Sequence, residues 1–161
     1  MHSVVIEADG YKLDVDIEKT IDYYKTNTLC MCPECRNFYI QAKESFPLLT
    51  QFLSQFGVDI TRPDELSANE FDGNIDYHFV AFTVAGEILQ SSKYEIDITD
   101  NGHFLNIVID NTYVPNEQQS HKCFTVTFFN IQLPWVLKEP YPNKIKRTSL
   151  LNKVKTLFTK G

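Results

Sequence analysis

The sequence predicts an α+β domain, in which an antiparallel β-sheet of about five or six strands is covered on one face by N-terminal helices. Two observations support this prediction. Apolar residues recur at helical spacing between residues 17 and 56. On either side of this region, apolar and polar residues alternate between glycine-containing turns, which is typical of antiparallel strands joined by hairpins.

The chain begins with a predicted β-hairpin that is followed by a short helix. Val4-Val5-Ile6 leads into the turn dipeptide Asp9-Gly10, after which apolar and polar residues alternate up to Asp16. Because aspartate is a favourable N-cap residue, Asp16 predicts a helix from Ile17 to about Lys25.

A longer helical pattern fills the stretch from Cys30 to Gly57. Six apolar residues recur at spacings of three and four: Phe38, Ala42, Phe46, Leu49, Leu53 and Phe56. Pro33 suits the first helical turn, where its missing N–H is not needed. Pro47 cannot continue a helix without strain, so the pattern predicts a break near Ser45–Phe46 and two helical pieces.

Strands are predicted over residues 77–84, 94–99, 104–109 and 123–137, and residues 61–76 are predicted to be a polar, turn-rich loop. Asn101-Gly102 is the clearest hairpin turn. In the predicted strand 123–137, the apolar residues change from even to odd positions near residues 128–130. Because a strand keeps a period of two, this change predicts a bulge or a crossing between layers.

Length and composition predict one domain over residues 1–139, followed by a basic tail over residues 140–161. The tail carries six basic and no acidic residues, and a short amphipathic helix is predicted after Ser149. The net charge of −6 therefore leaves −12 on the body, which makes nucleic acid an unlikely partner. The tail itself is expected to contact an acidic partner, a membrane surface or the acidic body. No signal peptide or transmembrane segment is recognised, which predicts a cytoplasmic protein.

Three of the four cysteines lie together as C-x-C-x-x-C at Cys30, Cys32 and Cys35. Thiolates are soft ligands that suit zinc, so these residues are a candidate metal site. A tetrahedral zinc site needs a fourth ligand. Three residues are candidates, although none stands at a diagnostic spacing: Cys123, His121 and His103.

Two other interpretations of the cysteines stay open. Cys32 and Cys35 have the C-x-x-C spacing of thiol–disulfide exchange, although no strand clearly precedes them as in a thioredoxin-like unit. A helix N-terminus favours thiolate over thiol, which predicts lowered pKa values for both. Alternatively, the cysteines are small, half-buried residues at a helix entrance with no chemical role.

No hydrolase, metalloprotease, P-loop or dinucleotide-binding motif is present in the sequence. The predicted function is a cytosolic, non-enzymatic binding or interaction protein with a structural metal, zinc, at Cys30, Cys32 and Cys35. The alternative is a thiol-dependent redox protein or sensor that uses Cys32 and Cys35.

The sequence also carries a longer pattern around the cysteines. The motif C-x-C-x-x-C-x-N-F-Y runs from Cys30 to Tyr39. Five further stretches accompany it: Ile17-Glu18-Lys19-Thr20, Tyr23-Tyr24, Phe46-Pro47, Phe56-Gly57-Val58-Asp59-Ile60 with Pro63, and Leu133-Pro134-Trp135-Val136-Leu137. Over most of residues 11–138 the chain resembles an uncharacterised family of small bacterial proteins with a CxCxxCxN[FY] motif. The family has no established activity, so the resemblance implies none. The basic tail and Cys123 stand outside the pattern, which weakens Cys123 as a fourth ligand.

Overall fold

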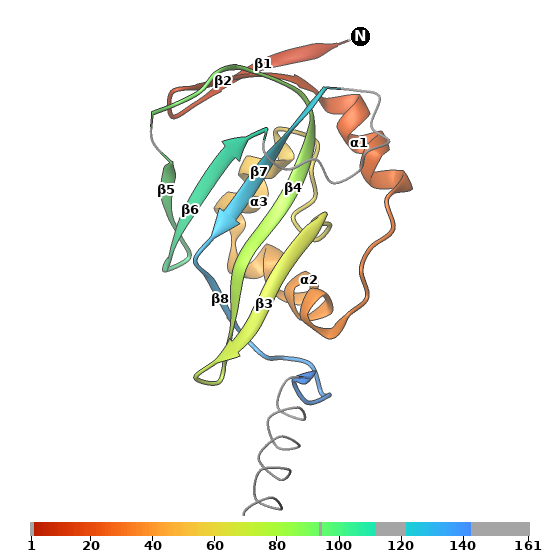
Figure 1. The fold of residues 1–161 in the computed structure, drawn as a ribbon, viewed down its shortest axis with the longest axis vertical. Helices are drawn as coiled ribbons and strands as arrows, with labels where there is room; N and C mark the ends of the chain where they lie inside the picture. The colour runs from red at the N-terminus through yellow and green to blue at the C-terminus, as the bar shows by residue number, and fades with distance from the viewer. Residues whose placement is uncertain (1, 94, 112–121, 143–161) are drawn as a thin grey trace, which may run out of the picture.

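The computed structural model describes residues 2–93, 95–111 and 122–142, and Figure 1 shows their course. The elements in chain order are β1 Ser3–Ala8, β2 Tyr11–Asp16, α1 Ile17–Thr26, α2 Pro33–Ser45, α3 Pro47–Ser54, β3 Glu65–Phe71, β4 Asn74–Gln90, β5 Ile96–Asp100, β6 His103–Asp110, β7 Cys123–Phe129 and β8 Ile131–Pro134. The α+β class is confirmed, but the described part of the chain forms an eight-stranded sheet instead of one with five or six strands. The helix predicted after Ser149 lies outside the described residues.

Strand β4 is the centre of the sheet, with 17 residues. On one side it pairs with β3 and β2, and on the other with β8 and β7, in every case antiparallel. Strand β1 extends the sheet beyond β2, while β6 and β5 extend it beyond β7. A strand of this length spans about 55 Å, which leaves room for two partners along each side.

Strand β3 falls in the segment that the sequence predicts to be a polar loop, so this prediction is wrong. Asp72 and Gly73 form a two-residue turn with φ values of 50° and 79°, which pairs Phe71 with Asn74. Asp-Gly is a hairpin dipeptide, so a local signal for the turn is present in the sequence. The strand itself gives a weak signal because most of its residues are half-buried and no apolar alternation marks one face.

The run 123–137 divides where its apolar residues change from even to odd positions, which confirms the predicted irregularity. Asn130 adopts a φ of 65° between β7 and β8. Phe128 before it and Ile131 after it are both fully buried. The turn at Asn130 therefore lets even-numbered residues point into the core before it and odd-numbered residues point into the core after it.

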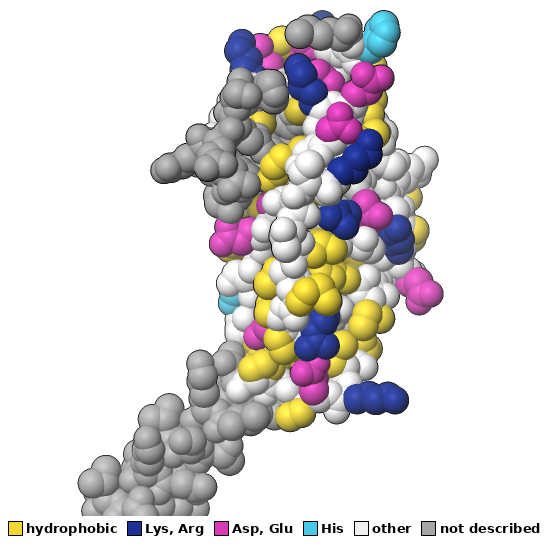
Figure 2. Space-filling view, turned by 90° about the vertical axis from the view of Figure 1, so that its right-hand side faces the viewer, with side chains coloured by type: hydrophobic (Ala, Val, Ile, Leu, Met, Phe, Trp, Pro, Cys, Tyr) yellow, Lys and Arg dark blue, Asp and Glu magenta, His cyan; other side chains and the backbone are white. Residues whose placement is uncertain are grey.

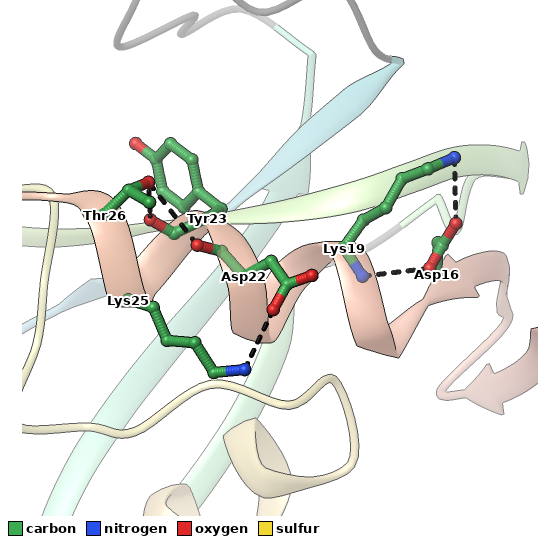
Figure 3. A network of polar contacts seen from close by, with 6 residues as sticks. All are labelled: Asp16, Lys19, Asp22, Tyr23, Lys25 and Thr26. Atoms are coloured by element: carbon green, nitrogen blue, oxygen red, sulfur yellow. Dashed lines mark hydrogen bonds and ion pairs between the residues drawn. The ribbon is translucent and has the colours of Figure 1, made fainter.

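Side chains make polar contacts near both ends of helix α1, and Figure 3 shows these contacts. At the start, the Asp16 carboxylate accepts a hydrogen bond of 3.0 Å from the backbone N–H of Lys19 and forms an ion pair of 3.0 Å with its Nζ. In the last turn, Lys25 pairs with Asp22 at 2.9 Å. The Thr26 hydroxyl donates to backbone carbonyls one turn earlier. Asp16 thus acts as the predicted N-cap.

Helices α2 and α3 are separated at Phe46, as the position of Pro47 predicts. Phe46 has φ −130° and ψ 67°, and Pro47 opens the next helix at its first position. The carboxylate of Asp100, from β5, accepts a hydrogen bond of 2.8 Å from the backbone N–H of Leu49. The start of α3 is therefore capped by the sheet, a contact that joins residues 51 positions apart.

Residues 135–142 form a segment that we call the C-terminal strap. The rings of Trp135 and Tyr141 pack edge to face, with centroids 5.2 Å apart. Tyr141 is 3% exposed, and its hydroxyl contacts the carbonyl of Ala68 in β3 at 3.4 Å. Tyr141 is thus a buried side chain just after residue 139, the last residue of the predicted domain, and the division into a domain and a tail from residue 140 stays a prediction.

One hydrophobic core contains side chains from the helices and from the strands. The helical region contributes Tyr24, Phe38, Ala42, Phe46, Leu49 and Leu53. The strands contribute Leu13, Val15, Ile75, Tyr77, Val80, Phe82, Val84, Ile107, Phe124, Val126, Phe128 and others. That the helices cover only one face of the sheet stays a prediction.

Candidate metal centre

The three cysteines of the C-x-C-x-x-C motif lie where the connection between α1 and α2 meets the first turn of α2. Cys30 belongs to residues 27–32, which form neither helix nor strand and run along the outside of the molecule (Figure 1). Cys32 is the N-cap residue of α2, with φ −64° and ψ 157°, and Pro33 opens the helix as predicted. Cys35 follows in the first helical turn. The proline therefore fixes where the extended chain becomes helical, and this change of direction brings the cysteines together.

The Sγ atoms of Cys30, Cys32 and Cys35 all lie within 4.8 Å of one another. Zinc–thiolate bonds of about 2.3 Å in tetrahedral geometry place two sulfurs about 3.8 Å apart. The sulfurs would thus need to approach one another by about 1 Å at most to share one ion. The donor set is made of soft sulfur atoms, which suit zinc and other thiophilic metals. The cluster can therefore hold a metal ion.

The cluster is open on one side and closed on the other. Cys30 is exposed, Cys32 is half-buried, and Cys35 is buried with 6% exposure. A metal ion held by all three sulfurs would consequently sit at the protein surface, with its innermost ligand fixed in the core and its outermost ligand in contact with solvent.

The pKa values of the three thiols differ in direction. The backbone N–H and the thiol of Cys32 hold the pKa of Cys30 below its ordinary value by hydrogen bonding. Burial raises the pKa of Cys32, against the opposing effect of the Cys35 backbone N–H. Burial also raises the pKa of Cys35, assisted by the two neighbouring thiols. The prediction that the helix N-terminus lowers the pKa values of Cys32 and Cys35 is therefore wrong, because desolvation of the thiolate outweighs the helix terminus.

Tyr39, the last residue of the cysteine motif, contacts the cluster, although its place in the motif does not by itself indicate this role. It stands four residues after Cys35, so both side chains project from the same face of α2. The Tyr39 hydroxyl donates a hydrogen bond of 2.9 Å to the backbone carbonyl of Cys30. Burial raises the pKa of this hydroxyl, and the neighbouring Cys35 thiol raises it further. Tyr39 thus ties the exposed cysteine to the helix that carries the buried one.

The start of α2, which carries Cys35, is anchored to the sheet and to the C-terminal strap by polar contacts. The Tyr77 hydroxyl of β4 donates to the carbonyl of Glu34 at 2.9 Å. Asn37 is fully buried, and its amide nitrogen donates to the Tyr77 oxygen at 3.0 Å and to the carbonyl of Pro134 at 3.1 Å. Its carbonyl oxygen accepts from the backbone N–H of Val136 at 2.9 Å. These contacts join residues 40 to 99 positions apart, so no local sequence signal could reveal them.

Arg36 makes a second connection between the cysteine segment and the C-terminal strap. Its Nε donates to the carbonyl of Met31 at 3.0 Å, and its Nη2 forms an ion pair with Glu139. The carbonyl of Glu139 in turn accepts from the indole N–H of Trp135 at 2.6 Å. The segment that carries Cys30 and Cys32 is thereby bonded to the strap through one side chain.

The candidate fourth ligands do not join the cluster where the structure describes them. Cys123 begins β7 opposite Ala85, and its pKa is raised by burial and by the charge of Asp64. His103 lies in β6 with its ring 5.1 Å from that of Phe46. His121 is outside the described residues. Among the described residues, the cluster of possible metal ligands therefore contains Cys30, Cys32 and Cys35 and no histidine, aspartate or glutamate.

Comparisons of the chain with models of known protein families, with curated proteins and with solved structures find no match. The resemblance to a bacterial family with the CxCxxCxN[FY] motif thus stays a prediction. Within the described residues, no helix has the length and apolar character needed to cross a membrane.

Proposed function

We propose that this protein is a non-enzymatic binding protein in which Cys30, Cys32 and Cys35 hold a structural zinc ion. The observation that carries this proposal is the convergence of three sulfur atoms within 4.8 Å of one another. Three unpaired thiols at this distance are most stable in a reducing compartment, which supports a cytoplasmic location. Binding would take the thiols as thiolates, because the thiolate is the metal ligand.

The proposed ion has a clear structural task. Residues 27–32 contain no helix or strand. Asn27 is bonded to Asp64 and Arg62 at the start of this segment, and nearer to Cys30 the backbone is held by the Tyr39 hydrogen bond and by the Arg36 contact to Met31. Metal bonds to Cys30 and Cys32 would fix this segment on the first turn of α2. That turn is already bonded to β4 and to the C-terminal strap, so the ion would join three parts of the chain at one point.

Three thiolates leave the fourth position of a tetrahedral zinc ion without a described protein ligand. Because Cys30 is exposed, water is the simplest occupant of that position. Three thiolates give the site a net charge of −1. The N–H groups of the first helical turn would offset part of this charge.

The binding part of the proposal rests on apolar side chains near the same elements. Met31, Ile40 and Val136 are 65%, 63% and 46% exposed, and they belong to the cysteine segment, to α2 and to the strap. Figure 2 faces the side on which α1 and α2 lie in Figure 1, and it shows hydrophobic side chains gathered in the lower half of the described part, between charged groups. Exposed apolar side chains that form a patch are typical of surfaces that bind another protein.

The metal is tested by native mass spectrometry on protein purified without chelators or immobilised-metal resin. The expected mass excess is that of one zinc ion, and it should disappear in Cys35→Ser. Cys123→Ser is the matched control, since that residue is a half-buried cysteine outside the cluster, and it should keep the zinc. A bare polypeptide mass, together with a melting temperature that added zinc leaves unchanged, would disprove the proposed centre.

The binding surface is tested separately by substitution of its most exposed helical residue. Ile40→Asp should abolish recovery of a partner that the wild-type chain captures reproducibly and that can be identified by mass spectrometry. Leu89→Asp is the control, because Leu89 is also an exposed aliphatic residue, at 51%, but lies in β4. Equal recovery with both variants would place the partner elsewhere on the molecule.

A further inference from the structure

The three sulfurs of the cluster differ sharply in their access to solvent. Cys30 is exposed and lies on a segment without regular structure, whereas Cys32 caps α2 and Cys35 is 6% exposed within it. A small reagent that approaches from solvent therefore meets the sulfur of Cys30 first. Once that sulfur has reacted, two further sulfurs stand within 4.8 Å of it.

We propose that Cys30 is the oxidation site of the cluster, through which a hydroperoxide converts two of the three cysteines to a disulfide and releases the metal. This inference rests on the proposed zinc centre and adds its regulation. Exposure selects Cys30 as the first sulfur to react, and the proximity of Cys32 and Cys35 supplies the second. It differs from exchange at the C-x-x-C pair, in which Cys32 and Cys35 alone would react.

The chemistry balances with hydrogen peroxide as the oxidant. The Cys30 thiolate attacks one oxygen of the peroxide, the O–O bond breaks, and the products are Cys30 sulfenic acid and hydroxide. The thiolate of Cys32 or Cys35 then attacks the Cys30 sulfur, an S–S bond forms, and a second hydroxide leaves. Two electrons pass from the two sulfurs to the peroxide, and protons from solvent convert both hydroxides to water. A single remaining thiolate is too few ligands to retain zinc, so the ion dissociates.

Tyr39 acts as a positioning residue in this sequence of steps. Its hydroxyl holds the backbone carbonyl of Cys30 at 2.9 Å, so the oxidised sulfur stays beside the other two after the metal bond is lost. Without this hydrogen bond, the contacts at Asn27 and at the Met31 carbonyl would hold the backbone of Cys30 less closely, so the sulfenic acid would move away from its partner more often. The sulfenic acid would then persist and become open to further oxidation.

The test uses the full chain loaded with zinc and treated with hydrogen peroxide. Zinc release is followed with a chromophoric chelator, and the modified cysteines are mapped by peptide mass spectrometry with a sulfenic-acid trap present. The expected result is about one zinc released per disulfide, with Cys30 in that disulfide and Cys30 as the trapped sulfenic acid. Cys123→Ser should release zinc at the wild-type rate.

Tyr39→Phe keeps all three thiols, so it tests the positioning of Cys30 without removing a metal ligand. It should raise the trapped fraction of Cys30 sulfenic acid by about fivefold, the change expected when one hydrogen bond is lost. Tyr141→Phe is the control, because it also removes one tyrosine hydroxyl, which contacts the carbonyl of Ala68 in β3 at 3.4 Å and not residues 27–32. Zinc that stays bound in excess peroxide, or first oxidation at Cys32 or Cys35, would overturn the inference. Protein that contains no zinc before treatment would instead refute the proposed centre itself.

Discussion

Replacing Asn37 with alanine is the sharpest test of how the candidate centre is supported. The side chain is fully buried and makes three hydrogen bonds, to Tyr77, to Pro134 and to Val136. Two of these partners keep another bond, because Gln41 also donates to the carbonyl of Pro134 and the Tyr77 hydroxyl also donates to Glu34. The backbone N–H of Val136 loses the acceptor that it has in the structure.

These contacts set the size of the effect. Each hydrogen bond contributes about 0.5–1.5 kcal/mol to stability, and a partly buried N–H left without a partner costs about 1–3 kcal/mol. A cavity the size of the lost amide adds to this cost. Asn37→Ala is therefore expected to lower the free energy of unfolding by roughly 2–4 kcal/mol, which corresponds to a fall in melting temperature of about 5–15 °C for a chain of this size.

The assay is urea unfolding followed by the fluorescence of Trp135, the single tryptophan of the chain, which lies in the strap that Asn37 anchors. Asn69→Ala is the matched control, since the Asn69 side chain makes one long contact of 3.4 Å to the carbonyl of Glu70. It should change stability by less than about 0.5 kcal/mol. A loss of less than about 1 kcal/mol in Asn37→Ala would refute the view that this residue anchors the strap to α2.

Four further predictions follow. Gly86→Ala should destabilise the protein by roughly 3 kcal/mol or more in urea unfolding, because the new Cβ would stand 2.1 Å from the backbone oxygen of Asp14 in the paired strand. Asp100→Ala should cost about 1–3 kcal/mol in thermal unfolding, since it removes the buried acceptor of the Leu49 N–H. Hydrogen bonding from the backbone N–H of residue 19 lowers the pKa of Asp16 below its unfolded value. The Asp16 carboxylate therefore stabilises the folded state above its unfolded pKa, and this stabilisation is lost as the pH falls through its folded pKa. The difference in unfolding free energy between wild type and Asp16→Asn, measured by urea unfolding, should shrink between about pH 5 and pH 2. Zinc affinity, measured by chelator competition, should rise by at least about tenfold per pH unit between about pH 6 and pH 8, because burial raises the pKa of the two deeper cluster thiols and their protons must leave before the metal binds.

The features that could be predicted from sequence depend on residues close together in the chain. Pro47 breaks the helix because its ring and its missing N–H act on the preceding turn. Asp16 caps α1 through a residue three positions later. The three cysteines converge within six residues, where a proline starts the helix, so their proximity follows from local backbone geometry alone.

The features that could not be predicted depend on contacts made across the fold. The raised pKa of Cys35 is the clearest case. The helix N-terminus argues for a lowered pKa, but Cys35 is buried in the folded chain, and the desolvation of its thiolate dominates. The sequence does not predict strand β3 for a similar reason, because its half-buried residues become a strand through pairing with β4.

A metal ion at the cluster would stabilise contacts well beyond the short segment that carries the three cysteines. Cys35 stands between Glu34, whose carbonyl is bonded to Tyr77 of the central strand, and Arg36, which is paired with Glu139 of the strap. A metal bond to Cys35 would therefore hold a helical turn whose two adjacent residues already bond β4 and the strap. In the opposite direction, displacement of the strap would free Arg36 and loosen its hold on the Met31 carbonyl, between the two outer cysteines. Because binding free energies are reciprocal, any stabilisation of the strap by the metal implies an equal stabilisation of the metal site by the docked strap.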